Sequence, residues 1–209
     1  MKSIGILVLG LAIMFSASVS EAANMLTNPG FENTAQDPWL GLWGNSQHTG
    51  TYGSTEAAMT GTSSVKITSN SASGTGDDYF MYSNTSAAVT PGTTYYGTIF
   101  AKTESLINEQ AFCKIDWFNS TGGWVGTAGA SSILSGTNDW TALNISGAAP
   151  SNASYASLAF FVNQTVDGGT GTAYFDNAYL DTTPIPEPTS LLLLGSGLVG
   201  LLGLRKKVK

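Results

Sequence analysis

Hydrophobic and polar residues alternate over short runs through the middle of the chain, and no stretch of residues 24–181 keeps the helical period of about 3.6 residues. In the segment 94–103, Tyr, Gly, Ile and Ala occupy one set of alternate positions, and Tyr, Thr, Phe and Lys occupy the other. A period of two places one set toward a core and the other toward solvent. The pattern predicts strands at Leu40–Trp43, Ser64–Ser69, Tyr79–Val89, Thr94–Thr103, Ala111–Phe118, Gly123–Ala128, Trp140–Ser146, Tyr155–Asn163 and Thr172–Leu180.

Turn-forming residues separate these runs. Pro91 fixes its own φ angle and Gly92 can adopt a positive φ, so the pair favours a tight turn between two strands. The Gly-rich segments Asn119–Gly123 and Asp167–Gly171 are typical of hairpin loops. About nine strands with this spacing predict an all-β fold, an antiparallel jelly-roll β-sandwich.

The N-terminus carries a signal for export. Lys2 provides a basic start, residues 4–15 are apolar, and Ser20 and Ala22 place small residues where a signal peptidase needs them. We therefore expect residues 1–22 to be a secretory signal peptide that is cut after Ala22, with Ala23 as the alternative site.

The C-terminus carries a second apolar segment. Pro186-Glu187-Pro188 is followed by a run of mostly Leu and Gly at about residues 189–204, and then by a basic end. The run is slightly shorter than the ~20 residues that cross a bilayer, and its basic end would stay in the cytoplasm. We expect a short transmembrane helix. A buried core helix is the alternative, although four terminal cations argue against it.

This order of signal peptide, body, Pro186-Glu187-Pro188, apolar run and basic end resembles that of PEP-CTERM proteins of Gram-negative bacteria. The resemblance covers about the last 25 residues, within a tail at 182–209, and implies processing by an exosortase, a membrane-embedded cysteine transpeptidase. It implies export across the inner membrane, a membrane anchor before processing, and release to the cell surface or extracellular matrix. The two prolines would keep the scissile region extended.

The body between the two terminal segments is acidic. Residues 23–188 contain 13 acidic residues, which are all of the chain's 14 except Glu21, and three basic ones, Lys66, Lys102 and Lys114, so the net charge is −10. Such a surface repels nucleic acid and anionic membranes, whereas cations and neutral polymers remain open as partners. Cys113 is the only cysteine, so no intramolecular disulfide can form.

Five segments follow one another along the body: NMLTNPGFE, PWLGLW, GTSSVKIT, VTPGTTYYGTIFAKT and GTAYFDNAYL. Their order resembles that of carbohydrate-binding modules with the galactose-binding-like jelly roll, specifically the CBM4/9-like group. The resemblance spans residues 24–181 and implies one jelly-roll domain. Because this fold carries many functions, sugar binding has to be argued from particular residues.

Aromatic side chains are the main candidates for sugar binding, because sugar rings present apolar C–H faces that stack on Trp and Tyr. Tyr82 and Trp117 lie on predicted strands where the concave face of the family would be, so we expect them to form the platform. Trp124 follows a Gly-Gly turn, and we expect it at the rim. Three lysines and no arginine in the body favour a neutral or acidic-poor extracellular polysaccharide as the ligand.

The same resemblance implies a structural calcium ion. In the family, a PGFE segment and the Asp of a closing FDN segment supply ligands, and the matching groups here are the Gly30 carbonyl and the Glu32 and Asp176 carboxylates. Further ligands come from the loop before the SVKI strand, where we place none. The alternative is a repelling carboxylate pair that stays in water.

No catalytic constellation stands out in the body. His48, the only histidine, lies in a segment that we interpret as a loop, and so do the adjacent Asp77 and Asp78 and the pair Glu104 and Glu109. We therefore expect an exported, exosortase-processed surface or matrix protein that binds carbohydrate and is not an enzyme. The alternatives are a structural matrix component without specific glycan binding, and a small glycosidase or lyase.

Overall fold

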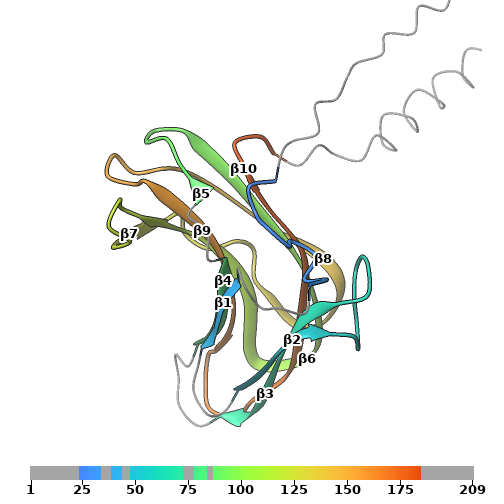
Figure 1. Ribbon diagram of the computed structural model, residues 1–209. Helices are drawn as coiled ribbons and strands as arrows, with labels where there is room; N and C mark the ends of the chain where they lie inside the picture. Colours follow the sequence, from blue (N-terminus) through green and yellow to red (C-terminus); the bar gives the residue numbers. More distant parts are fainter. Residues whose placement is uncertain (1–23, 34–38, 44–47, 73–77, 84–86, 185–209) are drawn as a thin grey trace, which may run out of the picture.

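The computed structural model describes residues 24–33, 39–43, 48–72, 78–83 and 87–184, and these residues form strands, turns and bends with no helix among them (Figure 1). The predicted all-β fold is confirmed. The strands are β1 (Trp39–Trp43), β2 (His48–Ser54), β3 (Ser64–Ala72), β4 (Asp78–Ser83), β5 (Ala87–Ala88), β6 (Thr94–Phe118), β7 (Trp124–Thr127), β8 (Leu134–Ala148), β9 (Tyr155–Gln164) and β10 (Gly169–Asp181).

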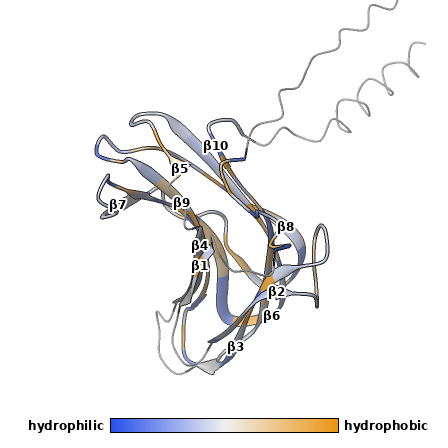
Figure 2. Ribbon diagram, viewed as in Figure 1, coloured by the Kyte–Doolittle hydropathy of each residue, from blue (hydrophilic) through white to orange (hydrophobic). Residues whose placement is uncertain are grey.

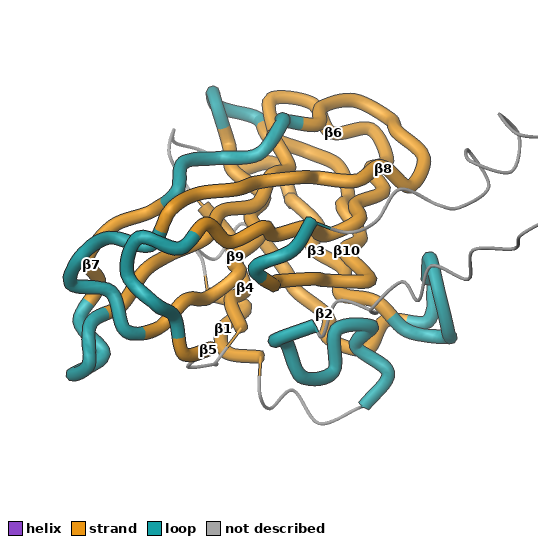
Figure 3. The backbone as a smooth tube through the Cα atoms, turned by 90° about the horizontal axis from the view of Figure 1, so that it is seen from above, coloured by secondary structure: helices purple, strands orange, loops and turns teal. Residues whose placement is uncertain are grey.

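The strands form one antiparallel sheet that folds over on itself into two layers, in the order β1-β4-β9-β6-β10-β3-β2 (Figures 1 and 3). Strand β6 belongs to both layers. Its first part, up to Ile107, pairs with β10, and its second part, from Glu109, pairs with β9. The opposite edge of β6 is covered by β8 and then by the short β7.

The hydrophobic core lies between the two layers (Figure 2). Phe160 of β9 stacks on Phe175 of β10, with 4.6 Å between ring centroids, so this contact joins the layers directly. Phe31 and Trp39 pack against Phe160 from the N-terminal part of the domain, at 6.0 and 5.8 Å. All four rings are almost completely buried, which makes them the centre of the core.

The predicted inward and outward sets of the segment 94–103 are confirmed except at Thr98, which is buried and donates a hydrogen bond to Asn144 of β8. Tyr95, Ile99 and Ala101 are buried in the core, whereas Phe100 and Lys102 are partly exposed on the outer face. The alternation therefore gives the correct phase for the first half of β6.

Two segments that we interpreted as loops are strands. Residues 104–109 continue β6 through two residues with positive φ, Ser105 (52°) and Asn108 (57°), so the strand bends without ending. His48 begins the edge strand β2, which carries Gly and Thr but few large apolar residues and therefore lacks a strong strand signal.

The first and last described segments of the domain lie side by side. The Met25 N–H donates to the Leu180 carbonyl at 2.9 Å, and the Asn24 side chain bonds both the Ala178 carbonyl and the Leu180 N–H. No helix in the described part of the chain is long and apolar enough to cross a membrane, and the expected span at 189–204 lies outside that part, as does the signal peptide.

Candidate functional site

A small apolar cluster lies on the outer face of the β9–β6 layer, separate from the main core. Phe112, Ala159 and Phe161 form it, and the two phenyl rings stack with 5.1 Å between centroids and an interplanar angle of 9°. The strand register explains the contact, because Phe112 is directly opposite Phe161 and Lys114 is opposite Ala159. We call Phe112, Lys114, Ala159 and Phe161 the outer-face cluster.

Lys114 lies over the rings of this cluster. Its Nζ is 4.6 Å from the Phe161 centroid and 5.2 Å from the Phe112 centroid, which is the geometry of a cation–π contact. The outer-face cluster is therefore an aromatic floor with one cation above it.

Trp124 is the large exposed aromatic beside this layer. It is 63% exposed on β7, opposite Phe118, and its indole Nε1–H donates to Asp116 Oδ1 at 3.4 Å. The turn before it is held by Asn119, whose side-chain oxygen accepts from the Gly123 N–H at 2.8 Å. Burial raises the pKa of Asp116, while the hydrogen bond from Trp124 opposes that shift. Trp124 is thus held next to the outer face with its ring in solvent.

The expectation that Trp117 forms a sugar platform is wrong. Its ring is 1% exposed and packs edge-on against Tyr95 in the core, with 5.9 Å between centroids. The prediction exchanged the inward and outward positions of this run. In the structure, Trp117 shares the inward face of β6 with Cys113 and Ile115. The charged residues Lys114 and Asp116 marked the outward phase of this run, and they would have identified Phe112 in its place.

The other two expected sugar-binding residues are placed differently. The backbone register pairs Tyr82 with Ala159 of the outer-face cluster, although the Tyr82 side chain lies outside the described part of the structure. Trp124 lies at the exposed position expected for it, and sugar binding by Trp124 and Tyr82 stays a prediction.

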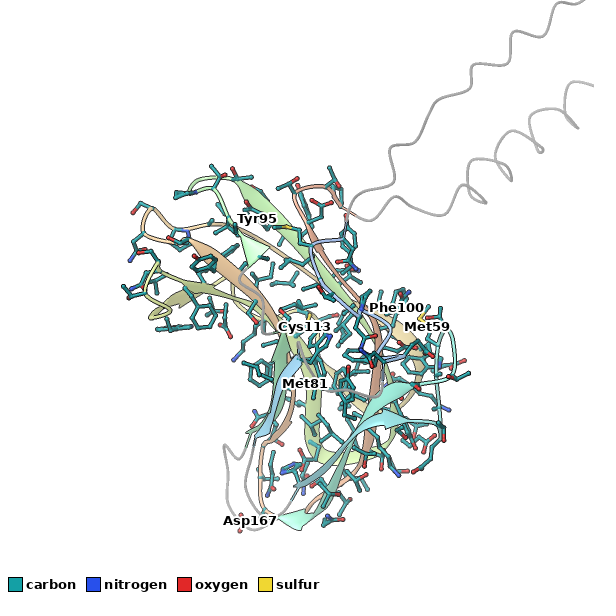
Figure 4. All side chains as sticks on the ribbon, in the orientation of Figure 1. Met59, Met81, Tyr95, Phe100, Cys113 and Asp167 are labelled. Atoms are coloured by element: carbon teal, nitrogen blue, oxygen red, sulfur yellow. The ribbon has the colours of Figure 1, made fainter. Side chains whose placement is uncertain are left out.

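The candidate metal centre lies on the other layer, where the N-terminal segment meets β10. The Asp176 carboxylate accepts N–H groups from Met59 and Thr60 at 2.8 and 3.0 Å, and from Asn177 at 2.6 Å (Figure 4 labels Met59). Burial raises the pKa of Asp176, and the negative charge of Glu32 adds to that shift. The ionised carboxylate is therefore costly here.

Glu32 binds the same loop that holds Asp176. Its carboxylate accepts the N–H groups of Thr62 and Ser63, which lower its pKa. Gly30 lies between the two acids, since a Cβ atom on it would be 3.8 Å from Glu32 Cγ and 3.9 Å from Asp176 Oδ1. The structure thus brings together the three residues that the family resemblance indicates.

These residues fit a calcium ion only in part. Glu32 and Asp176 offer hard oxygen ligands, and Ca²⁺ requires about six to eight of them. The loop presents N–H donors to both carboxylates, and the described residues contain no group of three His, Cys, Asp or Glu placed to hold a metal. Backbone carbonyls would have to complete the site.

A third polar group lies inside the domain. His48 Nε2 is 3.1 Å from Glu109 Oε1, and both side chains are fully buried. Ser69 Oγ is 2.5 Å from the same oxygen and 2.9 Å from the Gly169 carbonyl oxygen. Because this group is closed to solvent, it serves as a structural link between β2, β3, β6 and β10. The sequence predicts Glu109 and His48 in loops, so it does not predict this buried polar group.

Residues 184–207 match the family model described as the PEP-CTERM protein-sorting motif. The expected sorting signal, including Pro186, Glu187 and Pro188, is therefore confirmed, and the match covers the tail alone. No curated protein matches the chain.

The fold of the domain is similar to that of solved carbohydrate-binding modules. A family 61 module in complex with β-1,4-galactotriose has a TM-score of 0.52 at 16% identity over 76% of this chain and 98% of that one. The CBM22-1 xylan-binding domain of Paenibacillus barcinonensis Xyn10C has a TM-score of 0.52 at 13% identity, over 77% and 94%. The predicted jelly-roll fold is thus confirmed.

A third structure shares the fold within a much longer chain. The enzymatically active domain of tailspike protein 4 of bacteriophage CBA120 has a TM-score of 0.56 at 16% identity over 76% of this chain, which spans only 21% of the tailspike chain. At such identities the likeness shows the fold, and function has to be argued from the site.

We expect Gly169→Ala to destabilise the domain. A Cβ atom on residue 169 would clash with the Glu109 carboxylate and lie 3.1 Å from Gln164 Cδ, so the buried polar group would have to move. The loss in free energy of unfolding should be about 1–3 kcal/mol, measured by urea denaturation. The neighbouring Thr170→Ala is the control and should change stability by less than about 0.5 kcal/mol. An unchanged urea midpoint for Gly169→Ala would contradict the close packing.

Proposed function

We propose that residues 24–181 form a non-catalytic module that binds an extracellular polysaccharide through the outer face of the β9–β6 layer. The observation that carries the proposal is the exposed Trp124, which its hydrogen bond to Asp116 holds beside the outer-face cluster. The ring that a sugar can stack on is that of Trp124, since Phe112 and Phe161 are only 6% and 7% exposed, and the partly exposed Lys114 and Asp116 supply polar groups nearby. The fold shared with the xylan-binding and galactotriose-bound modules supports this proposal.

Binding of this kind should be weak. Exposed hydrogen bonds each contribute ~1 kcal/mol because water competes for the same groups. The affinity should lie between micromolar and millimolar, roughly −4 to −8 kcal/mol. Repetition of the sugar units along a polymer would then give retention in a matrix that single sugars cannot give.

The proposed location follows from the two chain ends. Removal of residues 1–22 and processing at the sorting motif would release the domain, after a transient membrane anchor, to the cell surface or the extracellular matrix. The confirmed sorting motif supports exosortase as the processing partner. The competing proposal is a structural matrix protein whose sandwich binds no specific glycan.

We expect Trp124→Ala to weaken polysaccharide binding about tenfold, because it removes a stacking surface worth roughly one kcal/mol or more. A glycan array first identifies the polysaccharides that the wild-type protein binds. Affinity electrophoresis of residues 23–184, in gels that contain β-1,4-galactan or xylan, then measures the loss of affinity. Tyr82→Ala tests the residue whose backbone is paired with Ala159 of the outer-face cluster. Trp140→Ala changes a Trp of β8 outside the β9–β6 layer and is the matched control. If wild-type protein binds no glycan, the structural-matrix proposal takes the place of this one.

We expect the mature protein to lack both terminal segments. Intact-mass measurement of protein from the native host should show the loss of residues 1–22 and of the segment after Pro188. A strain without exosortase activity is the control and should retain the tail. Mature wild-type protein that still carries the basic residues 205–209 would contradict processing.

We also propose that calcium binds between Glu32 and Asp176. The raised pKa of Asp176 supports this proposal, because the ionised form gains most from a nearby cation. The bound ion would supply positive charge between the acids and connect the N-terminal segment to β10. The loop N–H donors offer a second way to hold the carboxylates without metal.

We expect calcium at about 100 times its Kd to raise the melting midpoint by about 5–10 °C, since such binding adds about 2.7 kcal/mol. Without calcium, the Asp176 contribution to stability is present at low pH and is lost as the pH rises through its raised pKa. Because calcium binds the ionised carboxylate and protons compete with it, the rise in melting midpoint caused by calcium should become smaller on acidification. Thermal melts with calcium and with chelator measure both. Asp176→Asn should abolish the response, and the exposed Asp139→Asn should keep it. Equal midpoints for wild type in the two conditions would argue against the site.

A further inference from the structure

Lys114 differs from the other two lysines of the acidic body. Lys66 Nζ is 2.7 Å from the Glu56 carboxylate, and Lys102 Nζ is 3.3 Å from that of Glu104. Within the described residues, Lys114 forms no ion pair and instead lies over the two phenyl rings. In the described part of the outer face, no direct salt bridge neutralises the charge of Lys114.

The position of the Lys114 ammonium is restricted by the rings beneath it. Ring faces attract a cation but use none of its three N–H groups as a strong acceptor would. Among the described side chains, none accepts a hydrogen bond from these N–H groups, so they are donors that a ligand can use. A ligand that lies across the outer-face cluster would meet them together with the exposed Trp124.

We infer that Lys114 binds a carboxylate of the sugar chain, so that the ligand is a largely neutral polysaccharide with occasional uronic acid units. This inference rests on the proposed function and names the class of its ligand. A hydrogen bond between two charged groups contributes more than one to a neutral hydroxyl, so a carboxylate uses this lysine better than a hydroxyl does.

The rest of the charge distribution limits how many carboxylates the ligand can carry. The body has a net charge of −10, and Asp116 lies on the outward face two residues from Lys114. A densely anionic chain would meet repulsion along most of the domain. One carboxylate at Lys114, with neutral units on either side, satisfies the cation and avoids that repulsion.

Glucuronoxylan and its carboxyl-reduced form provide the test, because carbodiimide activation and borohydride reduction turn each carboxylate into a primary alcohol on the same backbone. Wild-type protein should bind the native polymer about 3- to 10-fold more tightly than the reduced one, with the difference shrinking as salt rises. Lys114→Met should bind both forms equally, and Lys114→Arg should keep the preference. Lys66→Met makes the same change in net charge on the other layer and should behave as wild type.

The outcomes separate this inference from the proposed function. Equal binding of both polymers by wild type, or an unchanged preference in folded Lys114→Met, would overturn the role of Lys114 and leave polysaccharide binding intact. Binding of neither glucuronoxylan form would overturn the role of Lys114, and binding of no glycan at all would overturn both. If Lys114→Met fails to fold, the wild-type comparison of the two polymers still decides.

Discussion

Strand β6 runs through both layers of the sandwich, so its bend decides which of its side chains face the core in each layer. Before the bend the inward positions are odd-numbered, ending at Thr103, and after it they are again odd-numbered, beginning at Glu109. Between them the inward residue is Leu106, and positive-φ residues at 105 and 108 each add one residue to the repeat. Two such irregularities restore the original alternation, whereas a single one would place the inward residues of the second half of β6 on its outer face.

That restored phase produces the candidate binding face. Because Cys113, Ile115 and Trp117 face the core, Phe112, Lys114 and Asp116 must face outward. The outer-face cluster is therefore not an addition to the fold. It lies on the opposite face of the part of β6 whose inward residues pack the second layer, and β9 contributes Phe161 because the register pairs it with Phe112.

The fold could largely be predicted from the sequence, and the sites could be predicted less well. Turn chemistry and alternation were sufficient for β6 up to Thr103 and for the last strands, because each signal is local. Strand β2 has no such signal. The inward and outward positions after residue 103 depend on positive φ angles at Ser105 and Asn108, and the identity of these two residues does not predict a positive φ. Trp117 was misplaced for a related reason, because an apolar aromatic fits either a core or a platform until its neighbours fix the phase.

The candidate metal centre and the candidate binding face lie on different layers, and this separation suits the processing that we propose for the two ends of the chain. Leu180 and Met25 join the first and last segments of the domain, and the sorting motif begins at residue 184, just after β10. In Figure 1, β7 lies at the left edge of the domain, in the layer opposite β10. The first and last described segments meet beside β10, on the layer opposite the proposed binding face. Processing at the tail can then proceed without altering the face on which Trp124 and Lys114 lie.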